Sequence, residues 1–518
     1  MIKEADFVFY PEELFNEEYV LQTLSDKFNI PKEVIKSFRI IRKSIDARKK
    51  VKYNVRIQCI SLSEVFPELT SEFDFRDVSK SKSVIIVGAG PAGYFAALNC
   101  LLTGFKPIVI ERGKSVEERK HDISKINRGL NLNPESNFAF GEGGAGTYSD
   151  GKLYTRSKKR GDIYKILQLL HYFGADDDIL INSHPHIGTD KLPGIMKKIR
   201  EKIVSSGGEI HFNSKVTKLI IEKDNIKGIE CEDGKLYSSD FVILATGHSA
   251  RDVYYFLENQ KVMISEKGFA MGIRVEHPQT LIDSIQYKRK ERGEFLPPAS
   301  YNLVKQIDNR GVYSFCMCPG GTIVCSATEK NQIVVNGMSN SRRNSLYANS
   351  GIVVELQPED FLTYSKNKVF SGLEFQKQIE DMAFVNSASG LQAPAQRLSD
   401  FVSEKISQDI PESSYHPGLI SSPLHFWLPE IISQKLQKAF KEFDKQMRGF
   451  ITNQAIVVGV ESRTSSPIKV LRDPTTFQSV NIKGLYPCGE GAGYAGGIVS
   501  SAIDGMMAVN KINEIIKH

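Results

Sequence analysis

The segment from Ser83 to Gly113 limits the fold of this chain more than any other stretch. Its β-branched run Val84–Val87 is typical of a parallel strand that is buried on both faces. The turn Gly88–Gly93, GAGPAG, follows directly, and an Ala- and Leu-rich run then predicts a helix over 94–102. A second apolar strand over 107–110 completes a βαβ unit. The sequence therefore predicts a parallel sheet covered by helices.

Each glycine of this turn has a physical task. Gly88 permits a tight turn, Gly90 lets the backbone approach a pyrophosphate, and Gly93 lets the helix and strand pack closely. The helix N-terminus offers free N–H groups and a positive dipole end to phosphates. Glu111 lies eighteen residues beyond Gly93, close to the spacing of an acid that hydrogen-bonds a ribose diol. Together these features predict dinucleotide binding rather than a merely structural turn.

Composition and charge exclude several other classes of protein. The chain has 518 residues, 41% of them hydrophobic and 25% charged, as expected for a soluble globular protein of about three or four domain-sized units. A net charge of +6 is mild for this length and disfavours a nucleic-acid partner. The seven scattered cysteines indicate a reducing compartment. No stretch approaches the roughly twenty apolar residues of a membrane span, so we expect a cytoplasmic protein without a membrane partner.

The rest of the chain divides into four parts. The N-terminal part begins with the pattern of a β-α-β-β unit, half of a ferredoxin-like sandwich. The part over 251–450 mixes alternating strands with two helices and is expected to form a substrate or cap domain. Its segment 390–397 is predicted to be a loop. The expected parts are an N-terminal appendage and linker (1–80), the first part of an FAD-binding domain (81–250), the cap (251–450) and the closing part of the FAD-binding domain (451–518).

Gly141–Lys152 is a second glycine-rich segment, which predicts either a second wall for the cofactor or a mobile loop. The first turn, Ala245–Gly247 and Gly489–Gly497 follow one another in a distinctive order, the last before a helix predicted from Ile498. The order resembles the FAD-binding Rossmann-like fold of the glutathione reductase type. The resemblance implies that Glu490 holds the ribityl chain, where the usual residue is Asp. It also implies that the final helix begins beside the flavin pyrimidine edge, where its dipole favours negative charge on reduced flavin.

Longer motifs extend this resemblance over nearly the whole chain. They are similar to those of a bacterial family of poorly characterised FAD-dependent dehydrogenases: NPES at 133–136, the segment 141–153, HIGTD at 186–190, RVEHP at 274–278, CMCPGG at 316–321, VNGM at 335–338 and ESRTSSP at 461–467. The resemblance implies non-covalent FAD in an α/β fold with an α+β cap and an α+β N-terminal appendage. It implies cofactor contacts from Gly88, Gly90, Pro91, Ala92, Gly93, Glu111, Arg112, Gly144, Thr147, Val216, Thr246, Gly247, Gly489, Glu490, Gly497 and Ile498, with Val216 acting through its backbone near the adenine.

His248, Arg463 and Cys316 are candidates for the chemistry, and Cys318 is a possible partner of Cys316. His248 follows Ala245–Gly247 at a strand end beside the expected cofactor, where it could be catalytic or part of the cofactor wall. Arg463 could bind an anionic substrate or stabilise reduced flavin, or it could instead form an ion pair with Glu461. Cys316 and Cys318 share one face of a predicted strand, as a redox pair or as buried thiols. No His, Cys or acidic cluster has metal-ligand spacing, so no metal is expected.

These observations predict a flavin-dependent oxidoreductase. Two electrons would pass through FAD to or from a small-molecule substrate held between the FAD fold and the cap. The chain has a single GxGxxG, so NADH or NADPH would dock only transiently as electron donor, or another donor would serve. The alternative is an FAD-containing RNA-modifying or nucleic-acid-binding protein, suggested by the net charge and by the basic run Lys152–Arg160.

Overall fold

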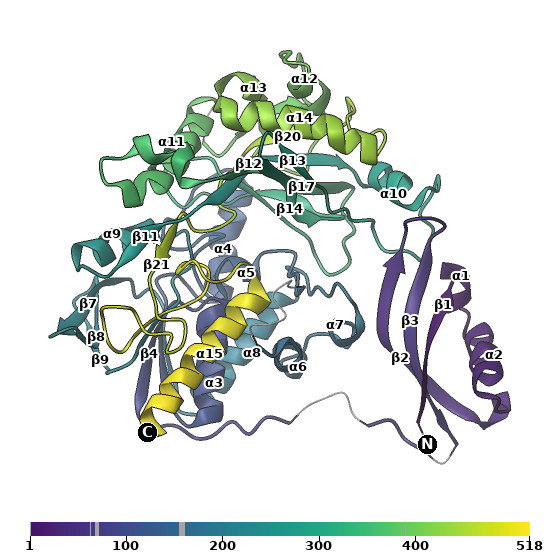
Figure 1. Cartoon of the computed structure of the whole chain (residues 1–518), viewed down its shortest axis with the longest axis horizontal. Coiled ribbons are helices and arrows are strands. Elements are labelled where there is room, and N and C mark those ends of the chain that lie inside the picture. The colour runs from purple at the N-terminus through teal and green to yellow at the C-terminus, as the bar shows by residue number, and fades with distance from the viewer. Residues whose placement is uncertain (1, 63, 68–71, 155–160, 389, 518) are drawn as a thin grey trace.

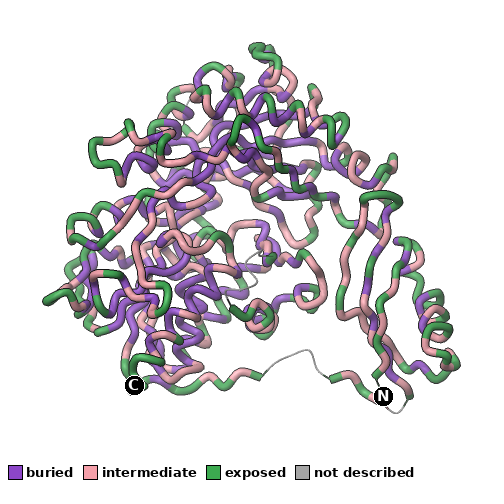
Figure 2. The backbone as a smooth tube through the Cα atoms, in the orientation of Figure 1, coloured by how far each residue is buried: buried purple, intermediate pink, exposed green. Residues whose placement is uncertain are grey.

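The computed structural model describes residues 2–62, 64–67, 72–154, 161–388 and 390–517. The fold is mixed α/β and has three units: a nucleotide-type unit around a parallel sheet, a cap above it, and an N-terminal unit at one side (Figure 1). Buried chain runs through both the parallel sheet and the cap, while exposed positions concentrate on the outer helices and loops (Figure 2).

A five-stranded parallel sheet forms the centre of the nucleotide-type unit. Its order is β22 (Leu485–Pro487), β10 (Val242–Leu244), β4 (Ser83–Val87), β5 (Lys106–Ile110) and β6 (Glu209–His211). Its strands are short, and the four from β22 to β5 are mostly apolar and buried because both faces are covered, whereas the edge strand β6 is only partly buried. The helices α3 (Pro91–Thr103) and α15 (Ile498–Lys517), from opposite ends of the chain, lie side by side (Figure 1). The remaining elements are α4 (Val116–Asn127), α5 (Gly144–Thr147), α6 (Ile163–Tyr172), α7 (Asp178–Ile181), α8 (Leu192–Ser205), β7 (Val216–Glu222), β8 (Asn225–Cys231), β9 (Leu236–Ser238) and α9 (Arg251–Asn259).

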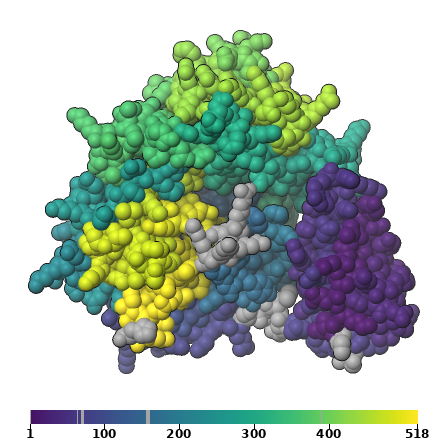
Figure 3. Space-filling view, viewed as in Figure 1, coloured from purple at the N-terminus to yellow at the C-terminus, as the bar shows by residue number. Residues whose placement is uncertain are grey.

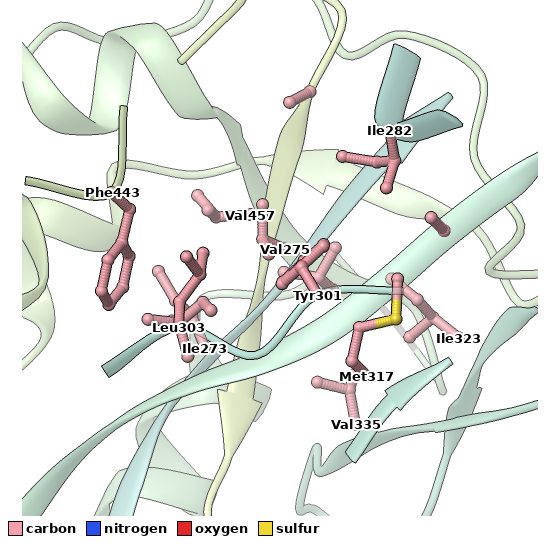
Figure 4. Packing of buried hydrophobic residues seen from close by; sticks show 14 of the residues in the cluster. Ile273, Val275, Ile282, Tyr301, Leu303, Met317, Ile323, Val335, Phe443 and Val457 are labelled. Atoms are coloured by element: carbon pink, nitrogen blue, oxygen red, sulfur yellow. The ribbon is translucent and has the colours of Figure 1, made fainter. Parts of the chain in front are cut away.

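The cap is built on a seven-stranded sheet. Its order is β13 (Val304–Ile307), β14 (Arg310–Cys318), β17 (Tyr347–Leu356), β12 (Phe269–Pro278), β20 (Ile456–Glu461), β18 (Ala393–Arg397) and β19 (Leu419–Ser421). Successive side chains of β12 point to opposite faces, so Ile273 and Val275 pack in the apolar core while Arg274 points to the other side. Figure 4 shows these two residues with Val457 of β20 and Phe443 of an outer helix.

Helices and short strands complete the cap. The outer helix that carries Phe443 is α14. The elements are α10 (Gln279–Tyr287), β15 (Thr322–Cys325), β16 (Val335–Met338), α11 (Ser371–Val385), α12 (Leu398–Val402), α13 (Leu424–Trp427) and α14 (Glu430–Gln446). The strands β11 (Ile264–Glu266) and β21 (Ile468–Val470) pair with each other and pack in the apolar cluster of the nucleotide-type unit.

The loop predicted over 390–397 is wrong, because Ala393–Arg397 forms strand β18 inside the cap sheet. Pro394 in this run is normally a strand breaker. Here β18 pairs with β19 at Ala393–Ala395 and with β20 at Ala395–Arg397. Two neighbouring strands therefore support an extended conformation that local sequence disfavours.

The boundary predicted at residue 451 also differs from the structure. It assigns β20 to the nucleotide-type unit, but β20 pairs with β12 and β18 of the cap sheet. The run Ile456–Glu461 is buried throughout, as a strand of either sheet would be. Only long-range pairing distinguishes the two cases, and the chain returns to the nucleotide-type unit after Glu461.

The N-terminal unit has the predicted β-α-β-β order. The strands β1 (Lys3–Phe9), β3 (Lys52–Ser61) and β2 (Ile35–Asp46) form an antiparallel sheet in that spatial order, and α1 (Pro11–Leu14) and α2 (Glu17–Phe28) precede β2. The expected linker contributes to the nucleotide-type unit at its end: Val78 is fully buried there, and its N–H donates to the carbonyl of Ser206 at 2.8 Å. Among the described residues, no helix is long and apolar enough to span a membrane.

Candidate functional site

The strand ends of the parallel sheet bring distant segments to one edge. Val87, the last residue of β4, is in register with Ile110 of β5 and with Leu244 of β10, and Leu244 is in register with Pro487 of β22. Because all four strands are parallel, the residues that follow them lie along the same edge. The first turn, Glu111, the Ala245–Gly247 segment and the Gly489 segment are therefore neighbours.

Two glycines of the first turn are required by packing. Gly88 has φ +105°, and a Cβ there would lie 2.4 Å from the Ala245 carbonyl oxygen and 3.3 Å from the Cα of Thr246. A Cβ on Gly93 would lie 1.9 Å from the Gly88 carbonyl oxygen. Neither position accepts a side chain without backbone movement. The turn is therefore pressed against the end of β10 and against its own helix.

The other glycine-rich segments approach the same turn. A Cβ on Gly144 would lie 3.1 Å from the Cα of Gly90, and one on Gly489 would lie 3.0 Å from the Cβ of Ala92. The N–H of Gly143 donates to the carbonyl of Ala89 at 2.8 Å. A Cβ on Gly146 would lie 3.3 Å from the Pro91 side chain and 3.2 Å from the Ile498 side chain. Thr147, the next residue, is buried.

Several glycines at this edge have open space where a side chain would stand. A Cβ on Gly247, Gly496 or Gly497 would meet no atom within 4 Å, and one on Gly90 would meet only Gly144, at 3.9 Å. The helices α3 and α15 begin beside these glycines, and α3 has no side-chain cap, so its first N–H groups are available. We call the surface formed by segments 88–93, 141–147, 245–248 and 489–498 the cradle. Its bare backbone and helix N-termini fit the phosphates and ribityl chain of FAD.

Glu111 holds two walls of the cradle together. Its carboxylate accepts hydrogen bonds from the N–H groups of Ala89 at 2.8 Å, Gly113 at 2.9 Å and Gly141 at 3.0 Å. A carboxylate has about four acceptor directions, so one remains for a ribose hydroxyl. Glu111 therefore braces the turn in addition to the ribose contact predicted from its spacing.

Arg112 and Val216 lie at the far side of Glu111. Arg112 donates to Glu135 at 2.5 Å and to Asp252 at 2.9 Å, and its guanidinium stacks 4.4 Å from the centre of the Phe140 ring. Val216 begins β7 and belongs to the same apolar cluster as Phe140. These side chains are engaged with protein atoms, so contacts to a cofactor would come mainly from the backbone.

His248 and Glu490 face each other beside the open glycines. The His248 Nε2 lies 3.9 Å from the Glu490 Oε1, and both side chains keep partial exposure, 15% and 27%. Burial and the positive charges of Arg463, Lys267 and Arg251 together lower the pKa of His248 to about 4. Burial also raises the pKa of Glu490 to about 7, against the opposing charge of Lys267. A neutral imidazole therefore stands next to a carboxyl group that exchanges its proton near neutral pH.

Arg463 does not pair with Glu461, which was one of the two sequence-based interpretations. Glu461 instead accepts from the Arg274 Nε at 2.7 Å, on the adjacent strand. Arg463 binds Glu380 of α11 through two N–H groups, at 3.0 and 2.9 Å, and donates to Thr328 at 2.7 Å. Its planar fork is thus already occupied by a carboxylate.

Glu380 and Lys267 were both missed by the sequence analysis. Glu380 is fully buried and also accepts from Arg251 at 2.8 Å. The available signal was its place on the apolar stripe of α11, three residues before the buried Ala383. Within the described residues, the Lys267 ammonium donates to two carbonyl oxygens, those of Gly268 and Ser466, at 3.4 and 3.3 Å. Lys267 lies between the strands β11 and β12, and no motif or periodic pattern in the sequence distinguishes it from other lysines.

Cys316 and Cys318 belong to a different cluster from His248. The strand β14 has an irregular register between Phe315 and Cys318, and Cys316 takes a left-handed φ of +45°. The charged groups around Cys316 are Lys152, Arg274 and Glu461, none of which is among those that shift His248. Burial raises the pKa of Cys318, as is usual for an unreactive thiol. In the described part of the chain, no group of three or more His, Cys, Asp or Glu could hold a metal ion.

Comparison with known sequences identifies relatives over most of the chain. A family model described as FAD-dependent protein, C-terminal domain-like, matches residues 268–464, and a domain of unknown function matches residues 1–60. An uncharacterised protein of Clostridium beijerinckii is 40% identical over 508 residues, which cover 94% of each chain.

Solved structures with an overall likeness have low scores. Tetracycline destructase Tet(51) is 10% identical with a TM-score of 0.34, over 84% of this chain and 87% of that one. The flavin-dependent brominase Bmp2 is 14% identical with a TM-score of 0.38, over 85% and 80% of the two chains. The family of this chain is therefore identified from its sequence relative and not from these structures.

Proposed function

We propose that this chain, which belongs to the same family as the uncharacterised Clostridium beijerinckii protein, is an FAD-dependent oxidoreductase that transfers two electrons through non-covalent FAD to or from a small-molecule substrate. The observation that supports this is the convergence of four segments, separated by up to about 400 residues, on one cradle of bare backbone. We propose that the cradle follows the glutathione reductase type, with the adenosine near Val216 and the isoalloxazine ring towards His248, Glu490 and Ile498.

The chain's own groups would divide the work between binding and proton handling. FAD, when bound, supplies reversible two-electron chemistry at its ring. The N-terminus of α3 would bind its phosphates, and the N-terminus of α15 would favour negative charge at the flavin ring. Glu490 would hold or release a proton at its carboxyl group near pH 7, while His248 stays neutral and accepts hydrogen bonds. The cap would exclude water from the cleft.

The experiment is reconstitution with FAD followed by anaerobic reduction. We expect the apoprotein to bind FAD stoichiometrically and turn yellow, and the bound flavin to be bleached by NADH or NADPH faster than free FAD. Dithionite serves as the control that the flavin is reducible. A colourless protein that cannot be reconstituted would contradict the cofactor; a yellow protein that neither nicotinamide reduces would require another donor.

The nucleic-acid alternative receives no specific support. Of the basic run Lys152–Arg160, residues 155–160 lie outside the described residues. Lys152 is engaged internally, with Asp150 at 3.4 Å and with the carbonyl of Met317.

The seven cysteines are free thiols, which fits the proposed cytoplasmic location.

A further inference from the structure

The groups around His248 carry more positive than negative charge. Arg251 and Arg463 are 6% and 9% exposed, and they share the single buried carboxylate of Glu380. The next carboxylate is Glu329, 3.5 Å from Arg251, whose side chain is 43% exposed and therefore screened by water. Two buried guanidinium groups with one buried counter-charge leave an excess of about one positive charge.

Arg463 also has one N–H group that donates to none of the described residues. A guanidinium has five N–H groups. Among the described residues, Glu380 takes two of those on Arg463, Thr328 takes one and Gln332 takes one at 3.4 Å. One N–H on Nη1 remains.

Lys267 adds a second cation without a close counter-ion. No carboxylate of the described residues lies within 4 Å of its ammonium, which donates only to two carbonyl oxygens. The Ser466 hydroxyl lies 2.9 Å from the Tyr254 hydroxyl, which donates to the Gly491 carbonyl at 2.8 Å, so Lys267 stands on the side of the cradle that carries Glu490. Lys267 is half-buried, and a partly desolvated cation without a counter-ion favours an anionic ligand.

We propose that His248, Lys267 and Arg463 form the binding site for the anionic group of the substrate, and that the substrate is a small organic carboxylate. The proposal rests on the proposed function and specifies its substrate class. Lys267 supplies the direct charge, the neutral imidazole of His248 donates one hydrogen bond to the carboxylate, and Arg463 lies behind them as a fixed positive charge. The open positions at Gly247, Gly496 and Gly497 leave room on the same side.

The same positive charge could instead serve the phosphates of the cofactor, which are also anionic oxygen groups. The experiment therefore uses the yellow holoprotein and two pairs of probes that differ in charge but hardly in shape: acetate against acetamide, and benzoate against benzamide. Binding is followed as a saturable change in the visible spectrum of bound FAD. We expect the carboxylates to bind at least about tenfold more tightly than the amides.

Variants at Lys267 test which group is responsible. Lys267→Gln should weaken carboxylate binding by about tenfold and leave amide binding unchanged, while Lys267→Arg should stay within about threefold of the wild type. Lys438→Gln, on the outer helix α14, makes the same change of charge elsewhere and should have no effect. Arg463 and Arg251 are left unchanged because both hold the buried Glu380, so removing either would disturb the packing of this cluster as well as its charge.

Three results would overturn the proposal. Equal binding of amides and carboxylates would remove the role of charge. No spectral change with any carboxylate would remove the site. FAD affinity is measured by titrating the apoprotein, and carboxylate affinity by titrating the holoprotein. If Lys267→Gln lowered both affinities equally, the charge of Lys267 would be assigned to the cofactor phosphates. Failure of the wild-type chain to bind FAD at all is a separate result, because it contradicts the proposed function before any carboxylate is added.

Discussion

The glycines of the cradle are of two kinds, and the difference decides what each substitution would do. Gly88 and Gly93 have backbone atoms where a Cβ would stand, at 2.4 and 1.9 Å. Gly90 has open space, and its φ of −74° is accessible to any residue. The first kind serves the fold, whereas the second leaves a surface that a ligand can approach.

We predict opposite outcomes for two substitutions in this turn. Gly93→Ala should lower the free energy of unfolding of the apoprotein by at least about 2 kcal/mol, because its methyl group collides with backbone. Gly90→Ala should change that free energy by less than about 0.5 kcal/mol but weaken FAD binding at least about tenfold, because the methyl group occupies the approach to the phosphates. Urea unfolding and fluorescence titration with FAD measure the two effects.

Gly194 in α8 is the matched control, since a Cβ there would meet nothing within 4 Å. Gly194→Ala should raise the free energy of unfolding by about 0.5–1 kcal/mol and leave FAD binding unchanged. If Gly90→Ala bound FAD as tightly as the wild type, the cradle would not be the phosphate site.

Glu490 should make the stability of the apoprotein depend on pH. Its folded pKa of about 7 lies above the unfolded value near 4.5, so the folded state retains a proton that the unfolded state releases. Stability therefore falls as pH rises from about 4.5 to 7, by an amount on the order of 2–3 kcal/mol, and the loss is complete above pH 7. Glu490→Gln should abolish this loss, so the variant gains stability over the wild type at pH 8 and hardly at pH 4.5.

Urea unfolding of both proteins at the two pH values measures this difference. An equal stability difference between the variant and the wild type at pH 4.5 and pH 8 would show that Glu490 ionises normally in the folded protein.

At the scale of elements, α11 fastens the cap to the nucleotide-type unit. Its Glu380 binds Arg251 at the start of α9 and Arg463 after β20, at 2.8 and 2.9 Å. Ser462 also donates to this carboxylate, at 2.6 Å. One buried residue therefore fixes three segments around His248.

We predict that Glu380→Gln destabilises the protein by about 3–5 kcal/mol, because it leaves two buried guanidinium groups without a counter-charge. Glu374→Gln on the same helix should cost less than about 1 kcal/mol, because Glu374 makes an exposed hydrogen bond with Tyr255. Urea unfolding of the two variants compares them directly. Equal effects would contradict the role assigned to Glu380.

At the scale of the whole molecule, the N-terminal unit forms a separate lobe that contacts both other units (Figure 3). Phe15 stacks on Phe295 of the cap with ring centres 5.3 Å apart, and the Tyr53 hydroxyl donates to the Phe295 carbonyl at 2.8 Å. On the nucleotide-type side, the Ser183 N–H donates to the carbonyl of Lys43 at 3.0 Å. The lobe is therefore held by the aromatic contact at Phe295 together with further polar contacts, among them Arg289 with Glu12 at 3.1 Å and Lys43 with Asp178 at 3.5 Å.

We predict that Phe295→Ala loosens this lobe without unfolding the rest. Removing the ring deletes the stacking contact, so proteolysis that separates residues 1–60 from the remainder should accelerate at least about tenfold, while FAD binding stays unchanged. Phe426→Ala is the control, because that ring is 82% exposed. Unchanged proteolysis in Phe295→Ala would show that other contacts hold the lobe.

The sequence by itself determined the parallel βαβ unit and most of the cradle. Gly88–Gly93, Glu111, Ala245–Gly247 and Gly489 each adjoin a short apolar strand, and local pattern suffices to place a turn at the end of a strand. Since parallel strands end at one edge, these turns had to meet.

Only the tertiary structure decided which residues face one another across the cleft. Arg463 found Glu380, 83 residues away, rather than Glu461, and β20 joined the cap sheet. The segment with Pro394 became a strand because β19 and β20 lie on either side of it. The physical reason is that sheet partners and buried ion pairs depend on long-range contacts, which leave no periodic trace in the segments that make them.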